Sequence, residues 1–429
     1  MLTAAEAADR LGVKVGTLYA YVSRGWLKSY KRRVGREALY RRSDIEALRG
    51  VSMPERGRRA RSLPDASSWV TIAQPRTDGP PSGVIVAESA VSSINDSGLA
   101  YRGYPIDELV EHASFEEVCL LLWRGERPAI AQVGALREAI AKVEMPAAVA
   151  AALDAAGREA PPLARLAITI SALAAIAPPE PHQPQIDHAP TIIGLMPLVM
   201  TAGRARSTGA SASHRDIAER LLYRSLGEAL EWERSAVDRV LVACAEHELN
   251  ASTFAARVVA STGADLYASV LAGLCSLSGP IHGGACDRIE RMFAELDAGV
   301  RIDALLTGFS ERHLLPPGFG HAIYPNGDPR AALLKQVATE IARRRGRRLL
   351  ETALKVEDAV WKRQRLHPNL DFYLTVCVRM IGFPRGLPAG VFALGRAAGW
   401  IAHSLEQYAD NRLIRPRMRY RGLALRHWE

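Results

Sequence analysis

Residue types that can act in catalysis or ligand binding occur in the second half of the chain. They lie in segments whose composition a hydrophobic core does not explain. The segments combine His, Asp or Arg with Gly, Pro or Asn, as in GPIHGGACDRIE, GFGHAIYPNGDPR and HPNLDFYLTV. The residues are His247, His282, His321, Arg330, Asp371, Arg396 and Arg415. Any single member has a structural explanation as a packed histidine, a helix cap or a surface cation. Their joint occurrence favours one functional site.

These residue types fit a site that binds a di- or tricarboxylate and removes a proton from carbon. Asp371 can serve as the carboxylate base, and the histidines can donate hydrogen bonds to an enolate oxygen. Arginine suits the substrate carboxylates because its planar fork binds them bidentately. Neutral histidines can donate without competing for the proton that the base removes.

Local patterns indicate how these residues are held. Two glycines after His282 let the backbone approach a neighbour closely and open a helix, with Asp287 in its first turn. Glycines also flank His321, whose loop we expect to carry polar side chains into the site, and Asp371 stands before an apolar helix. Upstream, SGVIVAESAVSSI predicts one short strand or hairpin. YRGYPIDELVEHASFEEVCLLLWRG predicts a turn, a helix, a break and a second helix.

The composition predicts a mainly α-helical protein. The 429 residues are 48% hydrophobic, enough for two or three domains with cores of their own, and strand-forming aromatic and β-branched runs are scarce. The five scattered cysteines contain no CxxC pair, so we expect neither a metal site nor a disulfide framework. No signal peptide and no apolar span of membrane length is found, so we expect a cytoplasmic protein without a membrane partner.

The positive charge is concentrated at the N-terminus. Residues 1–62 contain 15 Lys and Arg but 6 Asp and Glu, which gives them the same net charge, +9, as the whole chain. A cationic head on a balanced body suggests an anionic partner for the head alone. Within the head, Thr3 and Glu6 form a capping-box pattern for a helix that Gly12 ends.

A second short helix from about Val15 to Ser23 is predicted next, then a basic hairpin or wing, and then a third helix capped by Ser43 and Glu46. This order resembles the helix-turn-helix of MerR-like and excisionase-type proteins. The resemblance implies a DNA-binding domain over residues 1–49, with phosphate contacts that make affinity depend on salt. A helical protein-interaction module is the alternative. The expected DNA contacts are Lys14, Thr17, Tyr19, Arg24, Lys31, Arg32 and Arg33. Residues 50–82 are predicted to be a basic flexible linker.

From about residue 82 to residue 422 the chain resembles citrate synthase. The matching stretches occur in family order and span nearly the whole body, which makes the series highly specific. They are YRGYPIDEL, ASFEEVCLLLWRG, EHELNASTFAARVVAST, GPIHGGA, GFGHAIYPNGDPRA, PNLDFY, GRAAGWIAHSLEQ and IRPRMRYRG. The resemblance implies an almost all-helical fold with a large domain, residues 83–283 and 381–429, and a small lid domain, residues 284–380.

The resemblance also implies a reaction, the condensation of an acyl-CoA with oxaloacetate followed by hydrolysis of the citryl thioester, with no cofactor. Asp371 would remove a proton from the acetyl methyl group and His282 would donate a hydrogen bond to the thioester oxygen. His321 would polarise the ketone that the enol attacks. The residues that would hold oxaloacetate are His247, Arg330, Arg396 and Arg415, the last of them supplied by the partner subunit of a homodimer.

The chain departs from the family pattern at several positions. They are Glu246 (usually Asp), Cys286 (usually Asn), Ala322 (often Arg), Pro325 (usually Lys or Arg), and Leu374 with Thr375 (usually small residues). The cation lost at Pro325 contacts CoA phosphates in the family, and loss of a charge-assisted contact costs about 1.5–3 kcal/mol. Other basic residues, among them Arg102 and Arg312, can compensate.

Three functions follow from these patterns. The first is a citrate synthase of the tricarboxylic acid cycle, and the second is a 2-methylcitrate synthase that uses propionyl-CoA. The third is a transcriptional regulator whose body senses oxaloacetate, citrate or an acyl-CoA without turnover. The intact set of Asp371, His282 and His321 favours an enzyme, because a sensor needs no base. The helix-turn-helix and Pro325 favour the sensor.

Overall fold

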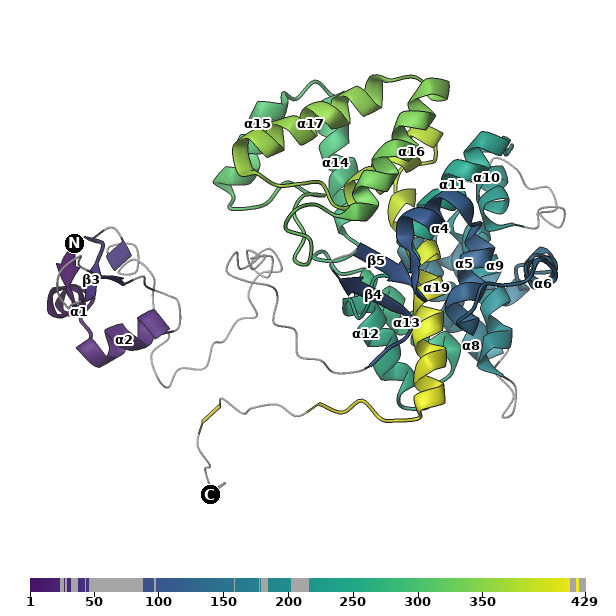
Figure 1. The fold of residues 1–429 in the computed structure, drawn as a ribbon, viewed down its shortest axis with the longest axis horizontal. Coiled ribbons are helices and arrows are strands. Elements are labelled where there is room, and N and C mark those ends of the chain that lie inside the picture. Colours follow the sequence, from purple (N-terminus) through teal and green to yellow (C-terminus); the bar gives the residue numbers. More distant parts are fainter. Residues whose placement is uncertain are drawn as a thin grey trace. The chain divides into compact units, whose positions relative to one another are not determined.

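The structure is a computed structural model whose chain falls into two compact units, residues 1–69 and residues 70–429 (Figure 1). The described residues are 1–23, 27, 29–31, 38–42, 44–45, 88–95, 98–157, 159–176, 178, 184–201, 216–416 and 422–423.

The N-terminal unit contains two short helices, which pack on each other, and a small antiparallel sheet that contacts the first helix. Its elements are β1 (Leu2–Thr3), α1 (Ala4–Leu11), α2 (Val15–Ser23), β2 (Tyr30–Lys31) and β3 (Ala38–Tyr40), with the strands in the order β1-β3-β2. Thr3 Oγ1 accepts the Glu6 N–H at 3.3 Å, and Glu6 Oε2 accepts the Thr3 N–H at 2.8 Å. The predicted capping box is thus confirmed. Gly12 follows α1 in the left-handed region, with φ +67°, as predicted for the helix end.

The predicted second helix and hairpin of this unit are also confirmed. Helix α2 has the predicted bounds, and β2 pairs antiparallel with β3, with Tyr30 opposite Leu39. The buried apolar cluster of the unit consists of Ala7, Ala8, Leu18, Leu27, Tyr40 and Ile45. Asp44 and Ile45 are helical, but most of the predicted third helix and the predicted linker, residues 50–82, lie outside the described residues.

A short antiparallel meander begins the second unit. Strands β4 (Ser92–Asn95), β5 (Gly98–Tyr101) and β6 (Tyr104–Pro105) pair in chain order. The segment predicted to form one short strand or hairpin, residues 82–94, contains the start of β4 at its end, whereas residues 88–91 form no strand and residues 82–87 lie outside the described residues. The second strand of the observed hairpin, β5, lies beyond the predicted segment. The fully buried Tyr101 hydroxyl lies 3.2 Å from the backbone oxygen of Val242 and 3.0 Å from that of Glu246. This contact fixes the sheet against the segment that precedes His247.

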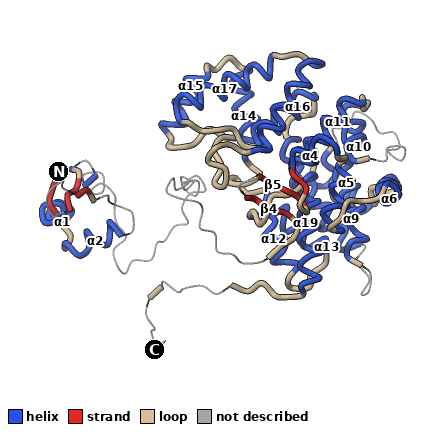
Figure 2. The backbone as a smooth tube through the Cα atoms, in the orientation of Figure 1, coloured by secondary structure: helices blue, strands red, loops and turns tan. Residues whose placement is uncertain are grey.

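Among the described residues, the remainder of the second unit is almost entirely helical, as predicted (Figure 2). The helices before residue 284 are α4 (Ile106–His112), α5 (Phe115–Arg124), α6 (Ile130–Ala141), α7 (Ala147–Ala156), α8 (Pro162–Ile176), the 3-10 turn η2 (Gln185–His188), α9 (Ala189–Met200), α10 (Ile217–Leu226), α11 (Glu231–Cys244), α12 (Ala251–Ala260) and α13 (Leu266–Leu277). Helix α4, the break and α5 agree with the predicted pattern. In the described part of the chain, no helix combines the length and apolarity needed to cross a membrane.

The long helix α19 (Leu387–Asp410) is the centre of this group and runs through its middle in Figure 1. It packs against α5, α8, α9, α11, α12 and α13. Small residues permit the close approach of its neighbours. A Cβ added at Gly395 would lie 2.8 Å from the backbone oxygen of Leu241, and one at Gly399 would lie 2.5 Å from that of Ala245. Only glycine fits at these two crossings.

A second group of helices follows residue 284 and lies together, in green, in Figure 1. Its members are α14 (Ala285–Asp297), α15 (Ile302–Glu311), α16 (Pro329–Arg345), α17 (Arg348–Gln364) and α18 (Leu370–Ile381). Helix α16 packs on α18, α15 on α17, and α14 on α18, while α14 and α18 also contact α19. The division into a large domain and a small lid at residues 283–284 and 380–381 stays a prediction.

Replacing Gly273 by alanine should destabilise the fold, because the new Cβ would lie 2.7 Å from Trp400 Cδ2 where α13 crosses α19. Overpacking of this kind costs about 1–3 kcal/mol. Gly134→Ala is the matched control, because Gly134 lies within α6 and an added Cβ meets nothing within 4 Å. Alanine there should add about 0.5–1 kcal/mol. Urea denaturation measures both variants, and equal stabilities would contradict the close crossing at Trp400.

Candidate active site

Most of the predicted site residues stand in loops or in first turns of helices. His247 lies between α11 and α12, His282 between α13 and α14, His321 between α15 and α16, Arg330 and Asp371 in the first turns of α16 and α18, and Arg396 within α19. Caps fix two of these helix starts. Asn250 Oδ1 accepts the N–H groups of Ser252 and Thr253, both at 3.1 Å, and Asn369 Oδ1 accepts the Asp371 N–H at 3.1 Å.

Two histidines and a tyrosine form one contact cluster. The rings of His247 and His321 lie edge to face with centroids 5.3 Å apart. The Tyr324 ring lies 5.4 Å from His247 and 4.8 Å from His321, and its hydroxyl is 3.0 Å from His247 Nε2. The loop before α16 is thereby held against the loop before α12, so residues more than seventy positions apart face the same space.

His321 is a neutral hydrogen-bond donor. Burial, together with the positive charge of Arg330, lowers the pKa of His321 to about 4. The Ile323 N–H donates to His321 Nδ1 at 3.1 Å, so the single ring proton is on Nε2. In the described part of the chain no protein group accepts that proton, which leaves it for a substrate oxygen.

His282 is held by Ser252 of α12. Its Nε2 lies 2.9 Å from Ser252 Oγ, which also accepts the Trp400 indole N–H at 3.2 Å. Burial, aided by the charge of Arg396, lowers the pKa of His282 to about 4, so this ring is neutral as well. Ser252 Oγ also lies 2.8 Å from Asn250 Oδ1, and its one proton can go to either acceptor. When the hydroxyl donates to His282 Nε2, the ring proton is on Nδ1, where it can be donated to a substrate oxygen.

The two glycines after His282 serve close packing, as predicted. A Cβ at Gly283 would lie 2.5 Å from the backbone oxygen of Leu277, and one at Gly284 would lie 2.9 Å from Pro280 Cα. Helix α14 begins directly after them, with Asp287 in its first turn. The backbone can therefore fold tightly under the histidine and turn into the helix.

The Asp371 carboxylate is partly buried and electrostatically balanced. Burial raises its pKa above the ordinary value, while the positive charges of Arg330 and Arg396 and a hydrogen bond from Cys286 act in the opposite direction. The Cys286 Sγ lies 3.5 Å from Asp371 Oδ1. The raised pKa makes the carboxylate a stronger base than that of an exposed aspartate.

Two arginines are buried beside these groups. Arg330 is 3% exposed, and its Nε and Nη2 donate to the two carboxylate oxygens of Asp328 at 2.9 and 2.8 Å. Arg396 is 1% exposed, its Nε donates to the Cys244 backbone oxygen at 2.8 Å, and its guanidinium lies 4.9 Å from the centre of the Phe392 ring. Buried guanidinium groups of this kind suit substrate carboxylates.

The same two cations act on the remaining histidine. Burial and the positive charges of Arg330 and Arg396 hold the pKa of His247 well below its usual range. Shared electrostatic partners and direct contacts bring six of the predicted residues together: His247, His282, His321, Arg330, Asp371 and Arg396. Neutral donors, fixed cations and one carboxylate base can together bind an oxoacid and stabilise an enolate.

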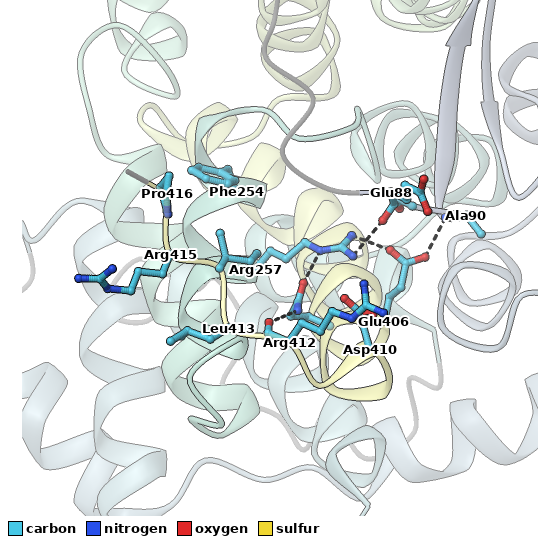
Figure 3. A pocket seen from close by; sticks show the side chains of 13 residues that line it. Glu88, Ala90, Phe254, Arg257, Glu406, Asp410, Arg412, Leu413, Arg415 and Pro416 are labelled. Carbon is cyan, nitrogen blue, oxygen red and sulfur yellow. Dashed lines mark hydrogen bonds and ion pairs between the residues drawn. The ribbon is translucent and has the colours of Figure 1, made fainter. Parts of the chain in front are cut away.

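Arg415 lies apart from these six. It is exposed and lines a hollow of about 890 Å³ at the end of α19, to which residues 88–90 also contribute (Figure 3). In the described part of the chain no contact joins Arg415 to the six. Its supply to a partner subunit's site stays a prediction.

A chain of buried polar groups begins beside His247. The Ser92 hydroxyl donates to Glu246 Oε1 at 2.9 Å, and His403 Nε2 lies 3.1 Å from the same oxygen. His403 Nδ1 is 3.2 Å from an Arg257 guanidinium nitrogen. Burial alone would raise the pKa of Glu246, but His403, Arg396 and the Ser92 hydroxyl together hold that pKa below the ordinary value.

The chain continues from Arg257 to the hollow in Figure 3, where dashed lines mark its bonds. Arg257 donates to Glu406 Oε2 at 2.6 Å, to Gln407 Oε1 at 2.7 Å and to the Glu88 backbone oxygen at 3.1 Å. Glu406 Oε1 accepts the Ala90 N–H at 2.8 Å. The segment that begins the described body is thereby bonded to α12 and α19.

The sequence patterns did not single out several of these partners. They are Tyr324, Ser252, Asp328 and His403. Each stands within a segment that carries a predicted residue, GFGHAIYPNGDPR, HELNAS or GRAAGWIAH, and that proximity is the signal that could have found them.

The predicted DNA contacts are partly described. Lys14 and Tyr19 are exposed beside or on α2, Thr17 lies on α2, Lys31 lies on β2, and Arg24, Arg32 and Arg33 lie outside the described residues. The predicted compensating cations have other partners. Arg102 donates to the Leu122 backbone oxygen, with the shorter bond at 2.7 Å, and the Arg312 guanidinium lies 5.6 Å from the Phe309 ring. Ala322 and Pro325 are exposed in the His321 loop.

The fold and the cluster define a mainly α-helical enzyme for carboxylate substrates. The chain belongs to the citrate synthase family, since residues 80–417 match the family described as citrate synthase, C-terminal domain. It is accordingly an acyltransferase of the citrate synthase type. Residues 1–49 match the family described as helix-turn-helix domain. Both predicted resemblances are confirmed.

Individual relatives agree with this membership. The chain is 35% identical over 351 residues to citrate synthase 2 of Bacillus subtilis, covering 79% of this chain and 94% of that protein. It is 32% identical over 359 residues to 2-methylcitrate synthase 2 of Corynebacterium glutamicum, covering 79% and 93%. Among solved structures, the ternary complex of Thermoplasma acidophilum citrate synthase with carboxymethyl coenzyme A and oxaloacetate matches with a TM-score of 0.70. That match has 27% identity and covers 80% of this chain and 96% of the other.

His321→Gln should make stability less sensitive to acid. The pKa of His321 is about 4 when folded, against roughly 6.5 when unfolded, so below about pH 6.5 the unfolded chain binds the extra proton. Stability is therefore lost as pH falls, by about 2 kcal/mol for this group between pH 7 and pH 5. Urea denaturation at the two pH values should show a smaller loss in the variant. His112→Gln, at an exposed histidine, is the control. Identical losses in all three proteins would contradict a buried neutral His321.

Proposed function

We propose that the chain condenses acetyl-CoA with oxaloacetate and hydrolyses the citryl thioester, yielding citrate and CoA. The observation that carries the proposal is the joining of a partly buried carboxylate base, Asp371, with two neutral histidines, His282 and His321, beside two buried arginines. A metabolite sensor would need the arginines but not the base.

The residues divide the reaction between them. Asp371 takes a proton from the methyl group while His282 donates a hydrogen bond to the thioester oxygen, so the enol forms without an exposed negative charge. His321 donates its Nε2–H to the oxaloacetate ketone oxygen and makes the ketone carbon electrophilic. The new carbon–carbon bond joins the former methyl carbon of acetyl-CoA to the ketone carbon of oxaloacetate. Water then cleaves the thioester. His247, Arg330 and Arg396 hold oxaloacetate, and the solved relative whose description names oxaloacetate and a coenzyme A analogue supports this substrate pair.

A second candidate reaction is 2-methylcitrate synthesis from propionyl-CoA. The curated relatives include 2-methylcitrate synthases at 32% identity, close to the 35% of the citrate synthase from Bacillus subtilis. The two reactions share all of the groups named above and differ only in the room beside the acyl methyl. In the described part of the chain, no contact identifies residues that enlarge the space beside the acyl methyl group. We therefore place the smaller substrate, acetyl-CoA, first.

The assembly that this function needs is a homodimer. The substrate carboxylates are complemented by Arg330 and Arg396 within one protomer, and Arg415 lies apart from them on an exposed segment. We infer that Arg415 completes the site of a second copy. An isolated protomer would then bind oxaloacetate weakly.

Residues 1–49 add a DNA-binding role to the enzyme. The support is the match to a helix-turn-helix family, the concentration of net charge in residues 1–62, and the exposure of Lys14 and Tyr19 at α2. We infer that residues 1–62 bind DNA and thereby place an active synthase there. Substrate binding to the enzyme can then be coupled to transcriptional control.

Asp371→Asn should lower turnover by at least about 100-fold, because loss of a positioned general base typically costs 10²–10⁴. Release of free thiol from acetyl-CoA or propionyl-CoA, with oxaloacetate present, measures it. Asp358→Asn is the matched control, an exposed aspartate on α17 that should leave turnover unchanged. The absence of turnover by the unaltered protein with either thioester would overturn the proposal.

Lys14→Ala in the full chain should weaken binding to the DNA upstream of its own coding sequence by roughly tenfold, since a charge-assisted contact is worth on the order of 1.5 kcal/mol. The slope of log affinity against log salt should also fall by about one. A gel-shift titration at several salt concentrations measures both. Lys355→Ala, at an exposed cation of the body, is the control. Equal binding by the two variants would argue against a DNA contact at α2.

A further inference from the structure

The thiol of Cys286 is the side-chain neighbour of the proposed base. Cys286 lies in the first turn of α14 and is fully buried, and Asp371 lies in the first turn of α18, which packs on α14. The Cys286 Sγ is 3.5 Å from Asp371 Oδ1, a normal distance for a hydrogen bond that involves sulfur. Two helix starts therefore meet at a thiol and a carboxylate.

The direction of this bond is fixed by the protonation of the two groups. Burial, together with the negative charge of Asp371, raises the pKa of the Cys286 thiol well above its usual range. The thiol keeps its proton at every pH at which the enzyme could work. The sulfur is therefore the donor and the carboxylate oxygen the acceptor.

The Asp371 carboxylate has no other side-chain hydrogen bond in the described part of the chain. Its backbone N–H and C=O are occupied elsewhere, by Asn369 at 3.1 Å and by the Thr375 hydroxyl at 2.8 Å. The charged and titratable groups that act on it are Arg330, Arg396, Asp328, Arg288 and Cys244. None of these orients the carboxylate by a bond.

We propose that Cys286 is a positioning residue of the reaction, which orients the Asp371 carboxylate with one weak hydrogen bond and leaves its charge available for proton abstraction. The inference rests on the proposed function. A thiol is a weak donor, so it fixes direction at little cost in basicity. A strong donor at the same place would stabilise the ionised carboxylate and make it a poorer base, whereas no donor would leave it more basic and less well oriented.

Two variants of the full chain should shift the pKa of the Asp371 carboxylate in opposite directions. Cys286→Ser keeps the size and supplies a stronger donor, so the acidic limb of kcat/KM against pH should move down by about half a pH unit and kcat should fall severalfold. Cys286→Ala removes the donor, so the limb should move up by a similar amount. KM for oxaloacetate should change little, because the substrate carboxylates are held by other groups. Cys275→Ser, at an exposed cysteine, is the matched control.

A purely structural role of Cys286 could lower activity, but it could not shift the acidic limbs of the Cys286→Ser and Cys286→Ala pH profiles in opposite directions. Shifts of the same sign in both variants, or none, would overturn the inference. If Cys286→Ala fails to fold, the sign of the Cys286→Ser shift decides. A titration of ¹³C-labelled aspartate by NMR, with the Asp371 signal assigned through its loss in Asp371→Asn, reads the same pKa without turnover. An inactive protein whose Asp371 signal shifts as expected would refute the proposed function and retain the role of Cys286; an unshifted signal would refute that role.

Discussion

One buried carboxylate, that of Asp328, ties the substrate-binding and proton-abstracting parts of the site together. It accepts two hydrogen bonds from the Arg330 guanidinium, the Arg330 backbone N–H, and the N–H of Leu370, the residue before Asp371, at 3.0 Å. Burial would raise the pKa of Asp328, but Arg330 holds it below the ordinary value. Breaking such a pair leaves an uncompensated buried charge, which costs about 3–5 kcal/mol. The cation on α16 and the base on α18 therefore keep a fixed relation.

The positive charges of Arg330 and Arg396 help to determine the protonation state of the nearby histidines. Arg330 and Arg396 are nearly inaccessible to water, and their charges add to burial in keeping His247, His282 and His321 unprotonated. A neutral imidazole has one proton to donate, and its place is set by the partner of the other nitrogen. At His321 that partner is the Ile323 N–H. Backbone geometry thus chooses the donor atom.

Much of the fold could be predicted because the signals act over a few residues. The Thr3–Glu6 box, the end of α1 at Gly12 and the tight turn after His282 are local, and the order of motifs along the chain identified the family. Contacts between distant residues were out of reach. The bond of Ser252 to His282 joins positions 30 apart, and that of Cys286 to Asp371 joins positions 85 apart. Such pairs depend on how helices cross, which no local pattern encodes.

Glu88 and Ala90 set a limit on where the protein can be cut. Their backbone groups are the partners of Arg257 and Glu406, in the buried chain that reaches Glu246 through His403. A shortened protein that begins after Ala90 would lose both hydrogen bonds, each worth about 0.5–1.5 kcal/mol. An exchange of the upstream domain that keeps the network of Arg257, Glu406 and His403 intact therefore has to leave Glu88 and Ala90 in place.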